Sequence, residues 1–398
     1  PIRREPGLIA IVRFRNATIY GLRIPFVESF THGTKSRRAS DALVVRLTTE
    51  EGVSGYGEGI ARPYVTGESI DSVVGQIRGA IWPAIRDVEL TDNDGLDSLA
   101  FAGKLLPSSD PDAEDEASGI IYHGAARSAV ELALLDLLTR MHGESVTTCM
   151  PPRTQKLRYS GVIGMVSPRA AAEQATKMNA AGLNEFKVKV GDDAGLDRLI
   201  AIRNVVGNDA SIRVDANGVW SFEQAVDQIA KMDAFGINMC EEPLGRQGVN
   251  VLPELAGCVP VPLLLDESLV TEADARVLVE MDSQQLRFNL RVSKCGGLGP
   301  CLALAAIARA HGLGFVIGCQ VGETSILSAA GRHLAAFLDD HLHLEGSFGT
   351  FLLSEDIAAP EVQFGPGGLG PLLTGPGLGA SIVEERLEKL AIFQETLR

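Results

Sequence analysis

The sequence predicts an α/β protein in which a small α+β domain precedes a (β/α) barrel. From about residue 157, eight short apolar segments alternate with helical stretches, as parallel barrel strands and their crossover helices do. Before that point, segments rich in β-branched residues are followed by helical patterns. Charged residues also end successive barrel strands, at the edge where barrel enzymes carry their catalytic groups.

Length and composition limit the classes of function. The chain has 398 residues, of which 45% are hydrophobic and 22% charged, so it can build a sizeable core and is too apolar for disorder. Its formal net charge is −15 and no stretch is strongly basic, so we expect no nucleic-acid partner. No apolar run reaches the length of a membrane-spanning helix, so we expect no membrane partner either.

The cysteines and the first residues predict a cytoplasmic protein. Six cysteines are scattered without a C-x-x-C pair, which favours reduced thiols over a disulfide scaffold or a zinc knuckle. Cys240, Cys295 and Cys319 lie in or beside apolar runs, where a thiol behaves as a small hydrophobe. The opening stretch, PIRREPGLIAIVRF, is too charged and strand-like for a signal peptide.

Residues 1–150 are expected to form the α+β domain. Its strands are rich in β-branched residues, and its second long helical pattern has apolar residues at 3.6 spacing and stops at Gly143. The expected elements are strands at residues 8–23 and 41–50, turns at 51–52 and 55–59, helices at 68–87 and 119–142, and a surface loop at 107–119.

Residues 151–370 are expected to form the barrel. Two of its helices carry N-terminal signals: Ser167 before Pro168, and Ser221 with Gln224 at capping-box spacing. A doubly wound open sheet is the alternative, but its G-x-G-x-x-G fingerprint does not follow any strand. The expected strands lie at residues 158–164, 186–191, 212–218, 237–243, 262–268, 287–294, 314–320 and 341–347.

Six charged residues stand at the carboxyl ends of successive predicted strands. Their separations of 25 to 29 residues are each about one βα unit, so they should occupy equivalent places on one rim of the barrel. One such residue is commonly a helix cap or a solvated side chain, but six in register indicate a functional site. They are Lys189, Asp215, Glu241, Asp266, Lys294 and Glu323.

The three adjacent carboxylates of this set predict a metal site. Asp215, Glu241 and Asp266 would converge in a pocket of low dielectric, where they repel one another unless a cation joins them. An all-oxygen ligand set suits Mg²⁺, with Mn²⁺ as an alternative, better than zinc or copper. A set of carboxylates in salt bridges is the other interpretation, and the lysines on opposite flanks of the trio weaken it.

The lysines are candidate acid/base groups. Lys187 and Lys189 are two residues apart in one strand and should share a face, where like charges lower a lysine pKa. Lys294 should stand across the barrel mouth, on the opposite side of a bound substrate. Two bases and a divalent cation that stabilises an enediolate could together abstract the proton α to a carboxylate.

Together these motifs resemble one family. The run F-K-V-K-V-G, D-A-N, E-E-P-L, D-E-S, K-C-G-G and G-C-x(3)-E-T is similar to the muconate lactonizing enzyme subgroup of the enolase superfamily. The resemblance implies an α+β capping domain over a modified (β/α)₇β barrel of the TIM type. It also implies that Asp215, Glu241 and Asp266 bind Mg²⁺, and that Lys189 and Lys294 are the two acid/base groups.

The resemblance gives further residues lesser roles. Lys187 would tune Lys189, while Asn217, Glu267 and Glu323 would touch the substrate or support the site. Specificity loops would lie near residues 24–37 and 57–68 of the cap, the first of which holds the candidate substrate contacts Thr31 and His32. Residues 371–398 would return to the cap, and the protein would be a homo-oligomer.

Departures from the family pattern bear on the substrate, a small-molecule carboxylate. Strand seven reads Gly-Cys-Gln where mandelate-type racemases have His, and strand eight lacks the Asp-x-Asp with which dipeptide epimerases hold the substrate ammonium. Glu345 could supply a single charge there. The first hypothesis is a racemase or epimerase of amino-acid-derived or dipeptide-like acids, and the alternative is a muconate-type cycloisomerase or an acid dehydratase. A Schiff-base aldolase and a non-catalytic binding protein are hypotheses of other classes.

Overall fold

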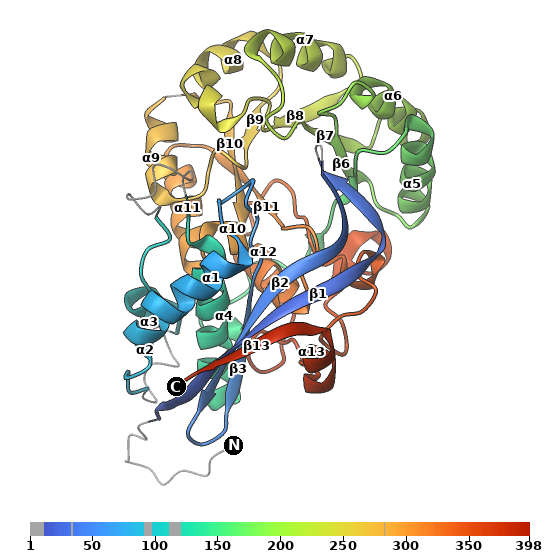
Figure 1. The fold of residues 1–398 in the computed structure, drawn as a ribbon. Helices are drawn as coiled ribbons and strands as arrows, with labels where there is room; N and C mark the ends of the chain where they lie inside the picture. The colour runs from blue at the N-terminus through green and yellow to red at the C-terminus, as the bar shows by residue number, and fades with distance from the viewer. Residues whose placement is uncertain (1–11, 33–34, 91–97, 111–120, 282) are drawn as a thin grey trace.

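The computed structural model describes residues 12–32, 35–90, 98–110, 121–281 and 283–398, without the side chains of residues 28–37 and 98. The chain forms two lobes that pack together: an antiparallel sheet with its helices, and a barrel of parallel strands surrounded by helices (Figure 1). The last strand of the chain returns to the first lobe and forms an edge of its sheet.

The sheet of the cap lobe has four strands in the order β13-β1-β2-β3. Strands β1 and β2 form a long hairpin that extends toward the barrel (Figure 1), so the described part of segment 24–37, predicted as a loop, is strand. Pairing runs out to His32 and Lys35, and residues 33–34 lie outside the described chain. The strands are β1 (Phe14–His32), β2 (Lys35–Thr49), β3 (Ser54–Gly59) and β13 (Ala391–Leu397).

The segment 55–59, predicted as a turn, is also strand. Its glycines, Gly55, Gly57 and Gly59, share one face of β3 because side chains alternate along a strand. A Cβ on any of them would overlap backbone atoms of α4 (Gly124–Met141), so the glycines allow the strand to lie directly on this helix. Helix α4 is buried on nearly every side between the sheet and the barrel.

Two helical segments of the cap lobe lie where they were predicted, within 68–87 and 119–142, whereas the helix at 98–105 was not predicted. The pattern at 68–87 forms one helical run that includes a π-helical turn and begins with a capping box between Ser69 and Ser72. Of the loop predicted at 107–119, residues 111–119 lie outside the described chain. The other helical elements of this lobe are α1 (Ile70–Gln76), η1 (Ile77–Ile81), α2 (Trp82–Ile85) and α3 (Ser98–Leu105).

Seven parallel strands form the barrel sheet in the order β11-β10-β9-β8-β7-β6-β5, and an eighth segment closes it. Within that segment, Glu345 N donates to Ile317 O on one side at 2.8 Å, and Leu344 O accepts from Ser160 N on the other at 2.8 Å. The predicted (β/α)₇β barrel is therefore confirmed. The strands are β5 (Gly161–Ile163), β6 (Glu185–Lys189), β7 (Ser211–Asp215), β8 (Ile237–Glu241), β9 (Leu263–Leu265), β10 (Leu286–Arg291) and β11 (Gly314–Gly318).

A helix follows each of the seven strands. Ser167 caps the first helix through Ala170 N, and Ser221 with Gln224 forms the predicted capping box. A short extra helix, α10 (Val292–Cys295), directly continues β10. The crossover helices are α5 (Pro168–Ala180), α6 (Gly195–Val206), α7 (Phe222–Asp233), α8 (Leu252–Cys258), α9 (Glu272–Glu280), α11 (Leu298–Ala310) and α12 (Ser325–Phe337).

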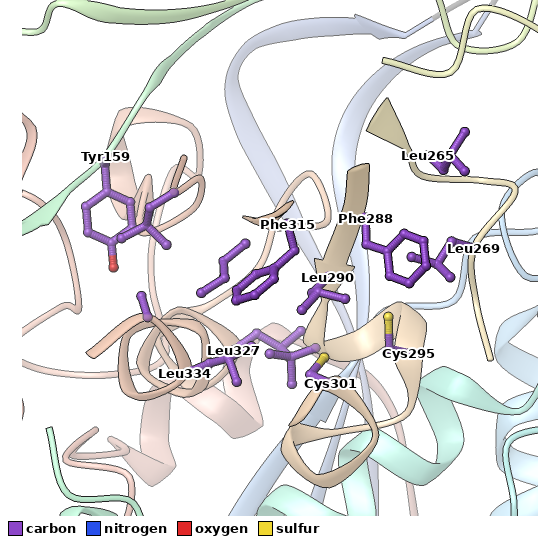
Figure 2. Packing of buried hydrophobic residues seen from close by; sticks show 14 of the residues in the cluster. Tyr159, Leu265, Leu269, Phe288, Leu290, Cys295, Cys301, Phe315, Leu327 and Leu334 are labelled. Atoms are coloured by element: carbon purple, nitrogen blue, oxygen red, sulfur yellow. The ribbon is translucent and has the colours of Figure 1, made fainter. Parts of the chain in front are cut away.

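Apolar side chains fill the space between the strands and their helices. Figure 2 shows Phe288, Leu290 and Phe315 of the barrel strands packed beside Cys295 and Cys301, all of them buried. In the described residues no helix has the length and apolar character needed to cross a membrane. The remaining elements are η3 (Val146–Thr148), β4 (Leu157–Arg158), η4 (Arg246–Val251), η5 (Gly349–Phe351), η6 (Pro366–Gly368), β12 (Leu369–Gly370) and α13 (Glu384–Leu390).

Candidate active site

Five of the six predicted strand-end residues meet at one place. Lys189, Asp215 and Glu241 end three neighbouring strands, and the register pairs Lys189 with Asp215 and Asp215 with Glu241. Asp266 follows β9 by one residue, and Lys294 lies on α10. All five are at most 3% exposed, so the cluster lies inside the molecule at the carboxyl end of the barrel.

Asp215 lies between the two lysines of β6. Its Oδ2 is 3.0 Å from Lys189 Nζ and 3.1 Å from Lys187 Nζ, while its Oδ1 accepts from Asn217 N at 3.0 Å. Lys189 also donates to Asn217 Oδ1 at 2.7 Å. The two lysines share a face as predicted, because they are two positions apart in one strand.

Glu241 receives all of its described hydrogen bonds on one oxygen. Its Oε1 accepts from Lys187 Nζ at 2.7 Å, Asn289 Nδ2 at 3.0 Å and Arg291 Nη2 at 3.3 Å. Its Oε2 is buried and has no hydrogen-bond partner in the described part of the chain. Burial raises the pKa of Glu241 to about 7, since nearby Asp215, Glu345 and Asp266 offset much of the attraction of Lys187.

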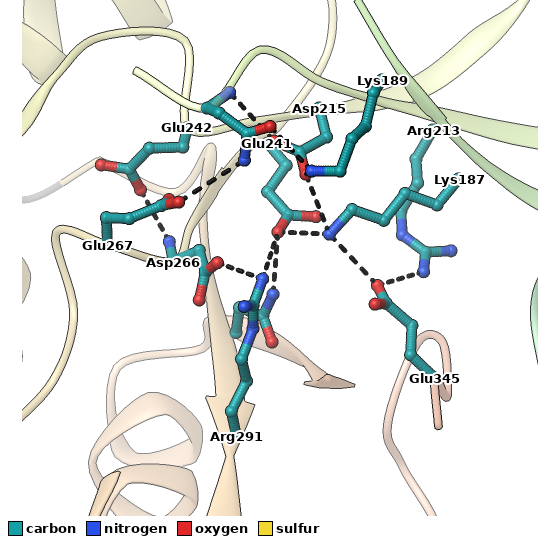
Figure 3. A network of polar contacts seen from close by, with 12 residues as sticks. Lys187, Lys189, Arg213, Asp215, Glu241, Glu242, Asp266, Glu267, Arg291 and Glu345 are labelled. Carbon is teal, nitrogen blue, oxygen red and sulfur yellow. Dashed lines mark hydrogen bonds and ion pairs between the residues drawn. The ribbon is translucent and has the colours of Figure 1, made fainter. Parts of the chain in front are cut away.

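Asp266 connects the other side of the cluster to Lys294. Lys294 Nζ donates to Asp266 Oδ1 at 3.0 Å, to Asp266 O at 2.8 Å and to Asn289 O at 2.8 Å. The remaining carboxylate oxygen, Oδ2, forms an ion pair with Arg291 Nη2. Burial acts against the charged carboxylate, but Arg291 and Lys294 outweigh it and hold the pKa of Asp266 below its ordinary value. Figure 3 shows Arg291 between Asp266 and Glu241.

The pKa of Lys187 moves in the direction opposite to the one predicted. Burial opposes its charge, but Asp215, Glu241 and Glu345 surround the ammonium and raise its pKa above the ordinary value. Lys189 was the neighbouring charge behind the predicted lowering, and these three carboxylates act in the opposite sense. Lys187 is therefore held as a charged ion-pair partner at the centre of the cluster.

Glu345, the single charge predicted at the end of strand eight, belongs to the same network (Figure 3). Its Oε1 accepts from Arg213 Nη2 at 2.5 Å and lies 3.5 Å from Lys187 Nζ. The side chain is only 5% exposed. Burial acts against the charged form, but Lys187, Arg213 and Arg291 prevail and lower the pKa of Glu345 to about 2.

Two residues predicted beside the site, Asn217 and Glu267, are linked to Lys189 by a chain of hydrogen bonds. Asn217 Nδ2 donates to Glu267 Oε1 at 3.5 Å, so the chain of contacts runs from Lys189 through Asn217 to Glu267. Asn217 has a φ of 51°, and Glu242, which follows the strand end at Glu241, has a φ of 40°. Few residues other than glycine adopt this left-handed region, which marks the two loops after β7 and β8 as constrained.

Glu323, the sixth predicted residue, lies apart from the hydrogen bonds of the cluster. It stands between β11 and α12, where its Oε1 accepts from Gln320 N at 2.6 Å. It lines a small cavity at the barrel mouth with Cys319, Gly346 and Phe348. Burial, followed by the charge of Glu58, raises its pKa to about 8 against the opposing Gln320 N–H, Arg291 and Arg62.

The predicted cap contacts Thr31 and His32 remain predictions, since their side chains lie outside the described structure. Their backbones pair with Ser36 and Lys35 in the β1–β2 hairpin. The hairpin also contacts the loop after strand eight, where Val27 N donates to Leu352 O at 2.9 Å.

Arg213, Asn289 and Arg291 belong to the site but were not predicted from the sequence. Each lies on a barrel strand that should be apolar, and each is buried in contact with a carboxylate of the cluster. The signal was present, because polar residues two apart recur in these strands: 187 and 189, 213 and 215, 289 and 291. Alternate positions of a strand share a face, so both residues of each pair could have been predicted to face the site.

The donor chemistry of the cluster fits a magnesium ion, although cations of the protein now join the carboxylates. Asp215, Glu241 and Asp266 offer only oxygen ligands, and the buried Oε2 of Glu241, which has no hydrogen-bond partner in the described residues, could bind a cation. Among the described residues no three His, Cys, Asp or Glu groups lie closely enough together to hold a metal. Lys187 and Arg291 stand between the carboxylates instead.

Comparison with known proteins relates most of the chain to one family. Residues 16–150 match the mandelate racemase / muconate lactonizing enzyme N-terminal domain, and residues 170–386 match the enolase C-terminal domain-like family. The chain is 28% identical over 393 residues to an N-succinyl-L-Arg/Lys racemase of Bacillus cereus, covering 96% of this chain and 98% of the relative. It is 29% identical over 375 residues to muconate cycloisomerase 1 of Rhodococcus opacus, covering 91% and 94%.

Solved structures give the same result. The N-succinyl Arg/Lys racemase of Bacillus cereus superimposes with a TM-score of 0.84 at 26% identity, over 97% of this chain and all of the other. A dipeptide epimerase of Enterococcus faecalis, in complex with Mg and the dipeptide L-Leu-L-Tyr, gives a TM-score of 0.79 at 25% identity, over 93% and 99%. The chain is thus an enzyme of the enolase superfamily and belongs to its mandelate racemase / muconate lactonizing enzyme subgroup.

Proposed function

We propose that this enzyme racemises or epimerises an amino-acid-derived carboxylate by removing and returning the proton on its α-carbon. The position of Lys189 and Lys294 on opposite flanks of the three carboxylates carries the proposal. One lysine takes the proton from one face of the substrate, and the other returns a proton to the opposite face. Asp215, Glu241 and Asp266 would hold Mg²⁺, or Mn²⁺ in its place, which when bound would neutralise the charge that develops on the substrate carboxylate.

The protein supplies the remaining requirements of this chemistry. Asp215 and Asn217 fix the ammonium of Lys189, and Asp266 with Asn289 O fixes that of Lys294, so both are aligned before a substrate arrives. The burial of the cluster keeps its electrostatic interactions strong and limits side reactions with water. Lys187 stays charged and keeps Asp215 and Glu241 together.

Glu345 favours a substrate that places no ammonium group at the end of strand eight. A substrate ammonium at the end of strand eight would need an uncommitted carboxylate, but Glu345 is engaged by Arg213 and Lys187. An N-acyl amino acid has no such ammonium, whereas a free dipeptide has one. The similarity to the N-succinyl-L-Arg/Lys racemase over nearly the whole chain supports the N-acyl class. Muconates also lack an amine, so the same observation favours cycloisomerisation as the second candidate.

Deuterium exchange tests the proposal and the substrate class together. The enzyme is incubated in D₂O with N-acyl amino acids, dipeptides, sugar acids and muconates, with Mg²⁺ or with EDTA, and the products are analysed by mass spectrometry. We expect Mg²⁺-dependent incorporation of deuterium at the α-carbon of N-acyl amino acids. Turnover confined to muconates would favour the cycloisomerase, loss of water from sugar acids would favour a dehydratase, and exchange that ignores EDTA would contradict the metal assignment.

A further inference from the structure

The side chain of Arg291 occupies the place between two of the candidate metal ligands. It is the last residue of β10 and is 5% exposed. Its Nη2 forms ion pairs with both Glu241 Oε1, at 3.3 Å, and Asp266 Oδ2 (Figure 3). The guanidinium therefore contacts the same two carboxylates that a metal ion at this site would contact.

The oxygen atoms in use show which contact a metal would have to replace. Lys294 bonds Asp266 through Oδ1, and Lys187 bonds Glu241 through Oε1. Asp266 Oδ2, by contrast, has Arg291 as its one ion-pair partner among the described residues, and Glu241 Oε2 has no hydrogen-bond partner there. Removal of the guanidinium alone would therefore leave one bare oxygen on each carboxylate.

The charge of the cluster explains why the guanidinium has to move. Arg213, Lys187, Lys189, Arg291 and Lys294 already surround the acidic groups of the cluster, so a divalent cation adds charge to a site that is already compensated. A lysine can lose its proton, but an arginine remains charged in proteins and can only leave the position.

Arg291 is held weakly on the side away from the carboxylates. Its Nε is buried without a hydrogen-bond partner in the described structure, and its Nη1 donates to Gln320 Oε1 at the long distance of 3.4 Å. Gln320 lies in the segment that leads to Glu323. The guanidinium can therefore turn away from the cluster toward the side-chain oxygen of Gln320 and the carboxyl group of Glu323.

From this geometry we infer that Arg291 is a built-in counter-cation that holds Glu241 and Asp266 in the metal-free enzyme and is displaced from them when Mg²⁺ binds. The inference rests on the proposed Mg²⁺ dependence. It assigns Arg291 a positioning role, because Arg291 keeps the metal ligands together when no metal is bound. Molecules in which Arg291 blocks the site cannot bind Mg²⁺, so their fraction lowers the apparent affinity for Mg²⁺.

Replacing Arg291 by methionine tests the inference, because methionine keeps an unbranched chain like the stem of arginine and removes the charged guanidinium. In the metal-free R291M protein, Glu241 and Asp266 lose a buried partner, so we expect a lower Tm in EDTA. We expect isothermal titration with Mg²⁺ to give a Kd at least about tenfold lower than that of the wild type. The difference in Tm should shrink at saturating Mg²⁺. R291K should fall between the two proteins, since its single point charge bridges two carboxylates poorly.

Arg203→Met is the matched control, because Arg203 is also buried but donates only to backbone carbonyls on the outer side of the barrel. It should lower the Tm and leave the Kd for Mg²⁺ unchanged. A Kd for R291M equal to or weaker than that of the wild type would overturn the inference while leaving the proposed function intact. Failure of every variant to bind Mg²⁺ would overturn both.

Crystal structures of the wild type with EDTA and with Mg²⁺ give a test that does not depend on the folding of a variant. The guanidinium should contact Asp266 in the first and should have left it in the second. A guanidinium that stays on Asp266 beside a bound Mg²⁺ would refute the displacement.

Discussion

Lys187 and Lys189 lie two positions apart on β6, yet their surroundings separate their roles. Lys187 contacts Asp215, Glu241 and Glu345 and is held charged, whereas Lys189 contacts Asp215 and the neutral Asn217. A lysine with three carboxylate partners is a poor proton acceptor, because those carboxylates stabilise its ammonium form. At the scale of residues, the number of charged neighbours therefore favours Lys189 as the base and Lys187 as the ion-pair partner.

A two-base mechanism predicts that each lysine acts on one enantiomer. We expect Lys294→Ala to slow the interconversion of enantiomers by about 10²-fold or more, since the proton donor on one face is gone. The enantiomer whose α-proton faces Lys189 should still exchange deuterium, and Lys189→Ala should show the reverse preference. Mass spectrometry of each pure enantiomer in D₂O measures both rates.

Lys156→Ala is the control for these variants, since Lys156 is exposed and lies on the opposite side of the barrel, by the amino end of β6. It should exchange both enantiomers at the wild-type rate. Equal loss of exchange for both enantiomers in each active-site variant would contradict the division of labour between the two lysines.

At the scale of elements, acidic residues of the cap fix helices of the barrel. Glu58 of β3 accepts from Thr324 N at 2.9 Å, from Thr324 Oγ1 at 2.7 Å and from Leu327 N at 3.0 Å, so it caps the first turn of α12. Glu131 of α4 does the same for α11 through Leu298 N and Gly299 N. These contacts join the two lobes and fix the start of α12, which directly follows Glu323 at the mouth of the site.

Glu58→Ala should therefore destabilise the protein well beyond the average surface substitution. It leaves the buried amides of Thr324 and Leu327 without their acceptor, for which we expect a loss of about 3 kcal/mol in the free energy of unfolding. Urea unfolding monitored by circular dichroism measures the loss. Glu58→Gln should be milder because it keeps one acceptor oxygen. Glu51→Ala, in the exposed turn between β2 and β3, should change little, and an equal effect of the two alanine variants would argue against the capping role.

Across the whole molecule, buried carboxyl groups make stability depend on pH. Burial raises the pKa of Glu58 and of Glu68 to about 7 and that of Glu323 to about 8. The folded protein thus holds these protons more tightly than the unfolded chain does. Their contribution to stability is complete below about pH 4.5, the ordinary value for a glutamate, and is lost as the pH rises through 7 to 8.

Glu323→Gln isolates one of these groups, because the amide oxygen can still accept from Gln320 N. Relative to this variant, the free energy of unfolding of the wild type should fall as the pH rises between about 4.5 and 8, by up to about 1.4 kcal/mol per pH unit. Urea unfolding of both proteins across this range measures the difference. Parallel pH profiles would show that Glu323 titrates in the folded protein as it does in the unfolded chain.

The parts of the fold that show a regular pattern along the sequence were predictable. Alternation of apolar strands and helices gave the eight barrel strands, and the regular spacing of charges gave the group of Lys189, Asp215, Glu241, Asp266 and Lys294. The segments 24–37 and 55–59 were assigned wrongly as loop and turn. The first segment is strand because the neighbouring stretches β1 and β2 pair as a hairpin, which no clear alternation of residues announced. The glycines of the second pack on the backbone of α4, which lies far along the chain.

The barrel, its rim of charged residues and the residue types that point to proton abstraction could be read from the chain, because strand periodicity fixes which side chains share a face and which end of the barrel they reach. The pairing of the charges came from the folded molecule. It joined Lys187 and Arg213 to Glu345 and put Arg291 between Glu241 and Asp266. A pKa and an ion pair depend on distances across the barrel, and those distances are set by closure of the sheet and by no local pattern in the chain.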